Sequence, residues 1–192
     1  STLIANQHPA FLVNRGGSIY STIKMSSTAT SNDVEATATI LTVAEKLEKL
    51  RSKMEELNID AYIVPSDDPH LSEYVPEAYM RRSYLSGFGG SAGTAVVFKN
   101  EACLWTDSRY HNEAAYQLDA DHWTLMKQGL PKVPSLTKYV SDSAVKKFSE
   151  CEKVFRVGID PFVHAASFEK EIMDAFKGAV EKSGLSDDAV VG

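Results

Sequence analysis

The sequence predicts an α/β domain in which helices flank a mixed β-sheet. From about residue 42, short hydrophobic runs of strand length alternate with segments in which apolar residues recur at helical spacing. Two of the runs, Thr94–Phe98 and Ala102–Trp105, are separated by Lys99-Asn100-Glu101, a pattern typical of a β-hairpin with its antiparallel pair. A hydrophobic share of 43% among 192 residues suffices for the core of one such domain.

The first helix is predicted to run from Val43 to Leu57. Thr42 and Glu45 form a T-x-x-E capping box, in which each side chain can satisfy the other residue's free backbone N–H. Asn58 is a fitting residue to end the helix. The apolar positions that follow the helical period are Leu47, Leu50, Met54 and Leu57.

A buried strand is predicted next, over 61–65, and a helical or irregular segment over 75–84. The glycine cluster that follows, at 87–93, precedes a β-branched strand and not a helix. A dinucleotide-type phosphate cradle needs the helix, so the cluster favours a tight turn that lets the backbone approach a neighbouring segment.

The second half of the chain alternates in the same way. We expect a helix over 108–118 with Asp107 as its N-cap, then a strand over 123–127 and a turn region over 129–134. Apolar positions between 136 and 148 indicate either one helix or a broken pair.

The carboxyl-terminal part adds one more strand and one more helix. A strand over 154–159 is ended by Asp160-Pro161, and the last helix is predicted over 167–182, with Gly184 as its stop. Residues 187–192 resemble a turn that enters a new strand, so we expect the chain to stop inside an element of a longer protein.

Residues 1–41 are predicted to be an amino-terminal extension, and the domain is assigned to 42–192. The extension is rich in Ser, Thr, Ala and Asn and has no sustained helical or strand period. Residues 1–24 contain Arg15 and Lys24 but neither Asp nor Glu, which is typical of an organelle transit peptide. The favoured alternative is a vector-derived or upstream-translated leader, with Met25 as the natural start.

Charge and cysteine content argue against several classes of protein. The formal net charge of −6 argues against nucleic acid or an anionic membrane as the main partner. No stretch of the sequence reaches the length of a transmembrane helix. Cys103 and Cys151 form neither a disulfide framework nor a zinc motif, so we expect free thiols in a reducing, cytoplasmic compartment.

The sequence contains no complete active-site motif. It has no G-x-S-x-G, H-E-x-x-H, C-x-x-C or Walker pattern. Asp67-Asp68-Pro69-His70 offers metal-ligating groups, but metal binding needs ligands that converge from several elements, and Asp before a helix usually caps it. We therefore expect no metal site and no cofactor within this chain.

Two arginine-containing segments are better candidates for a binding site. Arg81-Arg82 and Asp107-Ser108-Arg109-Tyr110 each lie where a loop meets regular structure. A planar guanidinium there can bind a peptide carboxylate or carbonyl. The alternative, which spacing alone favours, is an internal Arg–Asp ion pair that orders the loop.

Five ordered runs of the sequence resemble eukaryotic-type, three-domain aminopeptidase P, the Xaa-Pro aminopeptidase family. The resemblance extends over about residues 42 to 190 and is closest to the cytosolic enzymes. It implies the creatinase/prolidase amino-terminal fold, with a ribonuclease H-like motif. The five runs lie at 61–74, 81–94, 104–110, 123–129 and 157–161.

This resemblance implies the activity of a longer parent protein. The family removes the first residue from peptides with proline in second position, using a "pita-bread" catalytic domain. That domain carries two divalent metal ions, usually manganese, held by Asp, His and Glu ligands that have no counterpart here. We therefore expect this chain alone to be inactive. The resemblance further implies that the amino-terminal domain covers the active-site entrance, restricts substrate length and takes part in dimer contacts. We expect a cytoplasmic location, or a mitochondrial one if 1–24 are a native transit peptide.

One site residue can be carried over from the family, the arginine of its W-T-D-x-R-Y segment. The resemblance implies that this residue, Arg109, reaches the catalytic cleft and contacts the bound peptide. Asp107 and Tyr110 match as well and are implied to hold its loop, while Ser108 replaces the glycine common in the family. Arg81 and Arg82 also match the family, and a substrate role for them is a weaker expectation.

Two other functions stay open at this point. The chain could be a stand-alone peptide- or protein-binding module without a catalytic partner, although a free-standing module should not stop two residues into an apolar strand. It could also belong to a creatinase or prolidase relative with another substrate. The runs at 66–74 and 105–110 argue against that second alternative.

Overall fold

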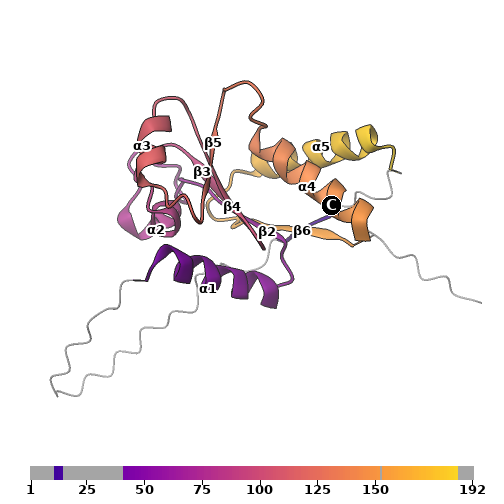
Figure 1. Ribbon diagram of the computed structural model, residues 1–192, viewed down its shortest axis with the longest axis horizontal. Coiled ribbons are helices and arrows are strands. Elements are labelled where there is room, and N and C mark those ends of the chain that lie inside the picture. The colour runs from indigo at the N-terminus through magenta and orange to yellow at the C-terminus, as the bar shows by residue number, and fades with distance from the viewer. Residues whose placement is uncertain (1–10, 15–40, 152, 186–192) are drawn as a thin grey trace, which may run out of the picture.

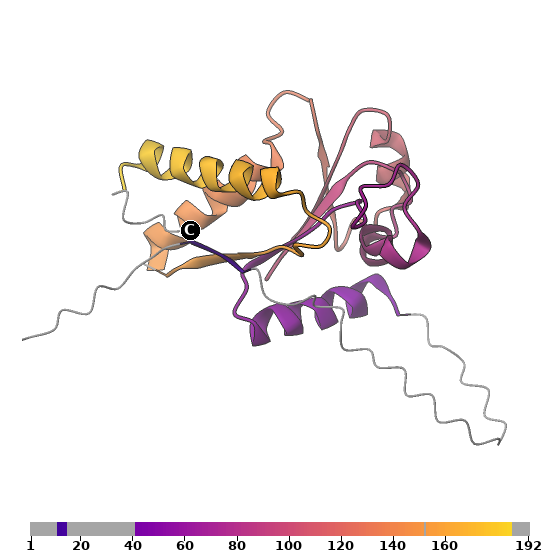
Figure 2. The same ribbon diagram turned by 180° about the vertical axis from the view of Figure 1, so that it is seen from behind.

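The computed structural model describes residues 11–14, 41–151 and 153–185, which form a mixed sheet covered by helices on both faces (Figure 1). Seen from behind, α1 again lies on one side of the sheet and α4 and α5 on the other (Figure 2). The predicted α/β fold class is thus confirmed. The helices are α1 (Val43–Glu56), a 3₁₀ turn (Glu77–Tyr79), α2 (Arg81–Ser86), α3 (His111–Gln117), α4 (Leu136–Cys151) and α5 (Ala166–Ser183).

The sheet has the order β1-β6-β2-β3-β4-β5. The pairs β2–β3 and β3–β4 are antiparallel, whereas β1–β6, β6–β2 and β4–β5 are parallel. The predicted hairpin is therefore β3–β4, and the mixed character of the sheet is confirmed. The strands are β1 (Phe11–Asn14), β2 (Ala61–Val64), β3 (Thr94–Phe98), β4 (Ala102–Thr106), β5 (Thr124–Lys127) and β6 (Phe155–Gly158).

Two hydrophobic clusters fill the two faces of this sheet. Successive strand residues point to opposite faces, so Ile63 packs toward α4 and α5 while Tyr62 and Val64 pack toward α1, α2 and α3. Both faces are covered, which is why every residue of β2 and β4 is buried and why all of them except Thr106 are hydrophobic. The core therefore occupies both faces of the sheet. Loops cover the two edges at which the strands begin and end.

The ends of two helices follow the sequence signals. At α1, Glu45 N donates to Thr42 Oγ1 at 3.2 Å and Thr42 N donates to the Glu45 carboxylate at 2.7 Å, so the predicted capping box is confirmed. Asn58 lies just beyond α1 with φ +53°, in the left-handed region. Gly184 ends α5 with φ +72°, a conformation that glycine adopts without steric cost.

Other predicted boundaries need correction. Helix α3 begins at His111, not Ser108, and its N-cap is Tyr110, so Asp107 as the N-cap was wrong. The reason is that the Asp107 carboxylate binds Arg109 instead, and residues 108–110 form a turn. The open choice between one helix and a broken pair is settled by α4, which is one helix.

The two ends of the chain are described only in part by the structure. Strand β1 lies within 1–41, where no regular element was predicted, and it pairs in parallel with β6. The rest of the extension, at 1–10 and 15–40, lies outside the described residues, as does the expected strand entry at 187–192. The division at residue 41 stays a prediction.

A buried carboxylate, Asp60, joins elements that are distant in sequence. Its side chain is 4% exposed, and it accepts hydrogen bonds from Lys147 Nζ at 2.7 Å and from Arg156 N at 2.9 Å. Lys99 Nζ lies 2.9 Å from the same carboxylate. Burial alone would raise the pKa of Asp60, but these donors outweigh burial and lower it.

We predict that Asp60→Ala lowers the free energy of unfolding by about 2 kcal/mol. Breaking a fully buried ion pair costs about 3–5 kcal/mol, and the loss is smaller here because both lysines can turn to water. Because the folded-state pKa is depressed, the contribution of Asp60 is complete above an unfolded pKa of about 3.9 and is lost as pH falls through the folded value. Urea unfolding of both proteins between pH 7 and pH 3 measures this.

Asp142→Ala is the control for this prediction, because Asp142 is exposed and pairs with Lys138 on the surface of α4. Its effect should stay within about 0.5 kcal/mol. Equal losses in the two variants, or a penalty for Asp60→Ala that does not shrink in acid, would contradict the assigned role of Asp60.

Candidate functional site

The predicted site residues gather at one edge of the sheet. Strands β2, β4, β5 and β6 all end at this edge, which we call the carboxyl edge, and β3 begins there. In open α/β sheets, loops after the carboxyl ends of parallel strands commonly form binding sites. The structure thus brings Arg81 and Arg82, from the segment after β2, to the same edge as Arg109, which follows β4.

Arg82 is buried beneath these loops. Its side chain donates from Nε to Ser66 Oγ at 2.9 Å, from Nη1 to Phe88 O at 3.1 Å and from Nη2 to Gly90 O. The residue is 4% exposed, and burial lowers the pKa of its guanidinium to about 10, so it stays protonated at neutral pH. One arginine therefore ties the segment after β2 to the glycine cluster.

The glycine cluster is held close to its neighbours, as predicted. A Cβ added to Gly90 would lie 2.8 Å from Tyr110 Cδ1 and would also overlap the Phe88 ring. Gly87 ends α2 with φ +75°, where other residues are strained. The cluster is thus a packed turn between α2 and β3.

Arg109 stands at the surface of this edge. It is held by Asp107, which accepts from Arg109 Nε at 3.0 Å, from Nη2 at 2.8 Å and from the backbone N at 3.0 Å. The Arg109 side chain is 68% exposed, against 35% for Asp107. The hydrogen bonds from Arg109 hold the pKa of Asp107 at about 2 and raise the pKa of Arg109. The Arg109 guanidinium is thus held in a defined orientation while most of it faces solvent.

Tyr110 fastens this turn to the glycine cluster. Its hydroxyl lies 2.6 Å from Ser91 Oγ, and its ring meets the Phe88 ring edge-on with centroids 6.1 Å apart. Ser66 and Ser91 were not singled out from the sequence. They belong to loops 16 and 19 residues from their partners Arg82 and Tyr110, and no spacing signal connects them.

Arg81 pairs with Asp160 from the loop after β6, while Asp160 also accepts from Phe162 N at 3.0 Å. The side chains of Arg81 and Asp160 are 15% and 2% exposed. An internal Arg–Asp pair, the alternative left open by the sequence, is thus the geometry observed for Arg81. A substrate role for Arg81 and Arg82 stays a prediction.

The aspartate loop after β2 forms a turn. Asp68 Oδ1 accepts from His70 N at 2.9 Å and from Ser72 N at 3.0 Å. Within residues 11–14, 41–151 and 153–185, no three His, Cys, Asp or Glu side chains converge as metal ligands would. This part of the chain therefore offers no donor set for a metal ion.

Two recesses lie at the carboxyl edge. One, of about 390 Å³, has Arg82, Gly90 and Ser91 in its lining, together with the strongly exposed Tyr74. The other, of about 230 Å³, is lined in part by Asp107.

Comparison with known proteins finds the same sequence pattern in one family. Residues 46–187 match the family model described as the creatinase/prolidase N-terminal domain. The chain is 43% identical over 146 residues to "Aminopeptidase P2" of Arabidopsis thaliana and 43% identical over 150 residues to "Probable Xaa-Pro aminopeptidase P" of Neurospora crassa. These matches cover 75% and 78% of this chain but 19% and 20% of the relatives, so the chain spans about a fifth of their length.

A solved structure is similar over the same part of the chain. It is the X-prolyl aminopeptidase from Caenorhabditis elegans, described as a cytosolic enzyme with a di-nuclear active site, with a TM-score of 0.61 and 35% identity. The match covers 72% of this chain and 23% of that protein.

We predict that Arg109→Ala raises the pKa of Asp107 from about 2 to near its ordinary value of about 3.9. The hydrogen bonds from Arg109 are the main cause of the depression, and they vanish with the side chain. Carboxyl NMR titration of the two proteins measures the change, with Asp142 as an internal reference. An unshifted Asp107 pKa would contradict the assigned pairing.

We also predict that Arg82→Met lowers the free energy of unfolding by about 3 kcal/mol or more. The change leaves two carbonyls and a hydroxyl without their charged donor in a buried place. Arg82→Lys should lose less, because its ammonium keeps the charge but cannot span three acceptors. Urea unfolding measures both losses. A loss within about 0.5 kcal/mol for Arg82→Met would contradict the stabilising role of the Arg82 hydrogen bonds.

Proposed function

The chain belongs to the creatinase/prolidase N-terminal domain family, and from this premise we propose that it is the amino-terminal domain of a metal-dependent Xaa-Pro aminopeptidase. Such an enzyme releases the first residue of a peptide whose second residue is proline. The identities of 43% to "Aminopeptidase P2" and to "Probable Xaa-Pro aminopeptidase P" support the proposal. The chemistry itself belongs to parts of the parent protein beyond this chain, which spans about a fifth of those relatives.

The single observation that carries a role for this domain is the Arg109 turn. Arg109 keeps its Nη1 without a hydrogen-bond partner among the described residues, while Nε and Nη2 bind Asp107. The guanidinium can thus donate to a peptide carbonyl or carboxylate without leaving its support. We assign Arg109 to substrate positioning, and Asp107 and Tyr110 to holding it in place.

We propose that Arg81 and Arg82, which are largely buried, support the site by holding its loops in place. Arg82 fixes the glycine cluster against which Tyr110 packs, and Arg81 fixes the loop after β6 through Asp160. In the parent enzyme, the carboxyl edge would form part of the active-site entrance and limit the length of the peptide. We also propose that the parent enzyme is a homodimer and that this domain takes part in the dimer contacts.

The parent enzyme would hold two divalent metal ions, manganese by the family resemblance. A di-nuclear site is described for the C. elegans protein, and the described residues of this chain supply no ligand set for one. The ions would activate water for attack on the peptide bond. What this chain contributes is the orientation of the peptide.

The proposed location is the cytoplasm, as described for the C. elegans protein, and a mitochondrial location would require residues 1–24 to act as a native transit peptide. Among the described residues, no helix combines the length and the apolar character needed to cross a membrane.

We predict that Arg109→Ala in the full-length enzyme lowers kcat/KM for an Xaa-Pro peptide about 10-fold to 150-fold, mainly through KM. That range corresponds to a lost hydrogen bond to a charged group, about 1.5–3 kcal/mol. Arg109→Lys should fall between wild type and alanine, because it keeps the charge and loses the planar fork. Steady-state kinetics over a range of peptide concentrations measures these effects.

Lys138→Ala is the matched control, since it removes one cation from another exposed ion pair, on α4. Its kinetics should equal those of the wild type. If Arg109→Ala leaves both KM and kcat unchanged, Arg109 does not touch the substrate. If full-length wild type fails to cleave Xaa-Pro peptides at all, the proposed activity is wrong.

A further inference from the structure

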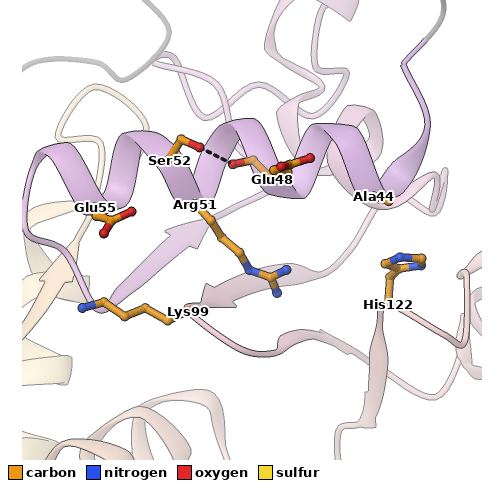
Figure 3. A pocket seen from close by; sticks show the side chains of 7 residues that line it. All are labelled: Ala44, Glu48, Arg51, Ser52, Glu55, Lys99 and His122. Atoms are coloured by element: carbon orange, nitrogen blue, oxygen red, sulfur yellow. Dashed lines mark hydrogen bonds between the residues drawn. The ribbon is translucent and has the colours of Figure 1, made fainter.

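A separate recess lies at the edge of the sheet opposite the carboxyl edge. It is formed between α1, the turn that joins β3 to β4, and the start of β5, and has a volume of about 420 Å³ (Figure 3). That volume is within the range of small-molecule sites, about 300–1,000 Å³. The lining residues are Ala44, Glu48, Arg51, Ser52, Glu55, Lys99 and His122.

Arg51 is the centre of this recess. Its Nε donates to Phe98 O at 3.0 Å, which fixes the plane of the guanidinium. The two terminal amino groups extend into the space between Lys99 and His122 (Figure 3). Among the described residues, neither amino group has a hydrogen-bond or ion-pair partner, although burial lowers the pKa of Arg51. The partly buried guanidinium thus has two amino groups that no described protein group binds.

The neighbouring carboxylates do not neutralise Arg51. Glu48 and Glu55 lie three residues before it and four residues after it on α1, a spacing at which side chains of opposite charge meet. No such ion pair is formed in the described structure, in which Arg51 turns to Phe98 instead. Both carboxylates stay on the helix side of the recess (Figure 3).

The other walls also leave Arg51 free. The Lys99 ammonium extends away from the guanidinium (Figure 3). It lies 2.9 Å from Asp60 Oδ1. The His122 ring stands on the opposite side, with Nδ1 3.0 Å from Asp119. The recess therefore offers a planar donor fork in its middle and two carboxylates on one wall.

We propose that this recess binds a zwitterionic ligand, an amino acid or short peptide, with the ligand's carboxylate on Arg51. A guanidinium fork matches a carboxylate in a bidentate geometry, and it gains most where its donors are partly desolvated and unpaired. Glu48 and Glu55 favour a ligand with an ammonium group and repel polyanions. The site is independent of the Arg109 turn, because it lies at the opposite edge and shares no residue with it.

Three forms of triglycine test this proposal on the chain as it stands. The free peptide is zwitterionic, the N-acetylated form keeps the carboxylate alone, and the C-amidated form keeps the ammonium alone. Titration by two-dimensional NMR at pH 7 and constant ionic strength should give saturable shifts around Arg51 and Phe98. The affinity should be highest for the free peptide, lower for the acetylated form and lowest for the amidated form. Citrate should bind more weakly than the free peptide.

Variants locate the binding site. Arg51→Met should weaken binding of the free peptide about tenfold or more, and Arg51→Lys should weaken it less, since lysine keeps the charge without the fork. The double change Glu48→Gln and Glu55→Gln should remove the preference for the free over the acetylated peptide. Lys53→Met is the matched control on α1, because Lys53 pairs with Glu56 outside the recess.

Several outcomes would overturn the proposal. They are the absence of saturable shifts around Arg51 and Phe98, equal binding of the amidated peptide, and equal weakening by Lys53→Met. A thermal melt of Arg51→Lys and Arg51→Met identifies any variant that is not folded, and the Glu48/Glu55 pair tests the site without touching Arg51. Shifts confined to 107–110, abolished by Arg109→Ala, would instead support the carboxyl-edge site alone.

Discussion

The carboxyl edge depends on one buried cation, the guanidinium of Arg82. Among the described residues, no carboxylate lies within hydrogen-bond distance of it, and its charge is stabilised by dipoles, the carbonyls of Phe88 and Gly90 and the hydroxyl of Ser66. It also lies over the Phe88 ring, 4.7 Å from the centroid. A buried charge is tolerated when each donor is satisfied, and here those acceptors are backbone groups that must stay in place. These hydrogen bonds therefore fix the position of the glycine turn relative to Arg82.

The architecture explains why the two proposed binding regions lie at edges. Both faces of the sheet are covered, by α4 and α5 on one side and α1, α2 and α3 on the other. The core uses the faces completely, so exposed polar groups collect where strands begin and end. Each edge carries one arginine that is oriented by a neighbour yet keeps donors free, Arg109 beside Asp107 and Arg51 beside the Phe98 carbonyl.

The sequence predicted local features better than it predicted contacts between loops. The Thr42 capping box, the β3–β4 hairpin and Gly184 depend on residues within a few positions of one another, and all were correct. The N-cap of α3 was wrong because Asp107 has two possible partners, a backbone N–H of the helix and the side chain of Arg109, and sequence spacing does not show which wins.

The candidate site was predicted in part. Arg109 was found through its family motif and not through its spacing, and the support from Ser91 depends on how two loops fold together. Arg51 carried no signal at all, because in sequence it is one charged residue among many on an amphipathic helix. That its amino groups bind no described protein group is seen only once the fold places the Phe98 carbonyl beside Nε.

The position of β6 between β1 and β2 has a consequence for synthesis on the ribosome. Asp60, beside β2, binds Arg156 of β6 across 96 residues. At about 5–20 residues per second, one side of β2 has no β6 to pair with for about 5–20 s after β2 emerges. An unpaired strand edge is a template for pairing with another chain, so the nascent domain is exposed to wrong association during this interval.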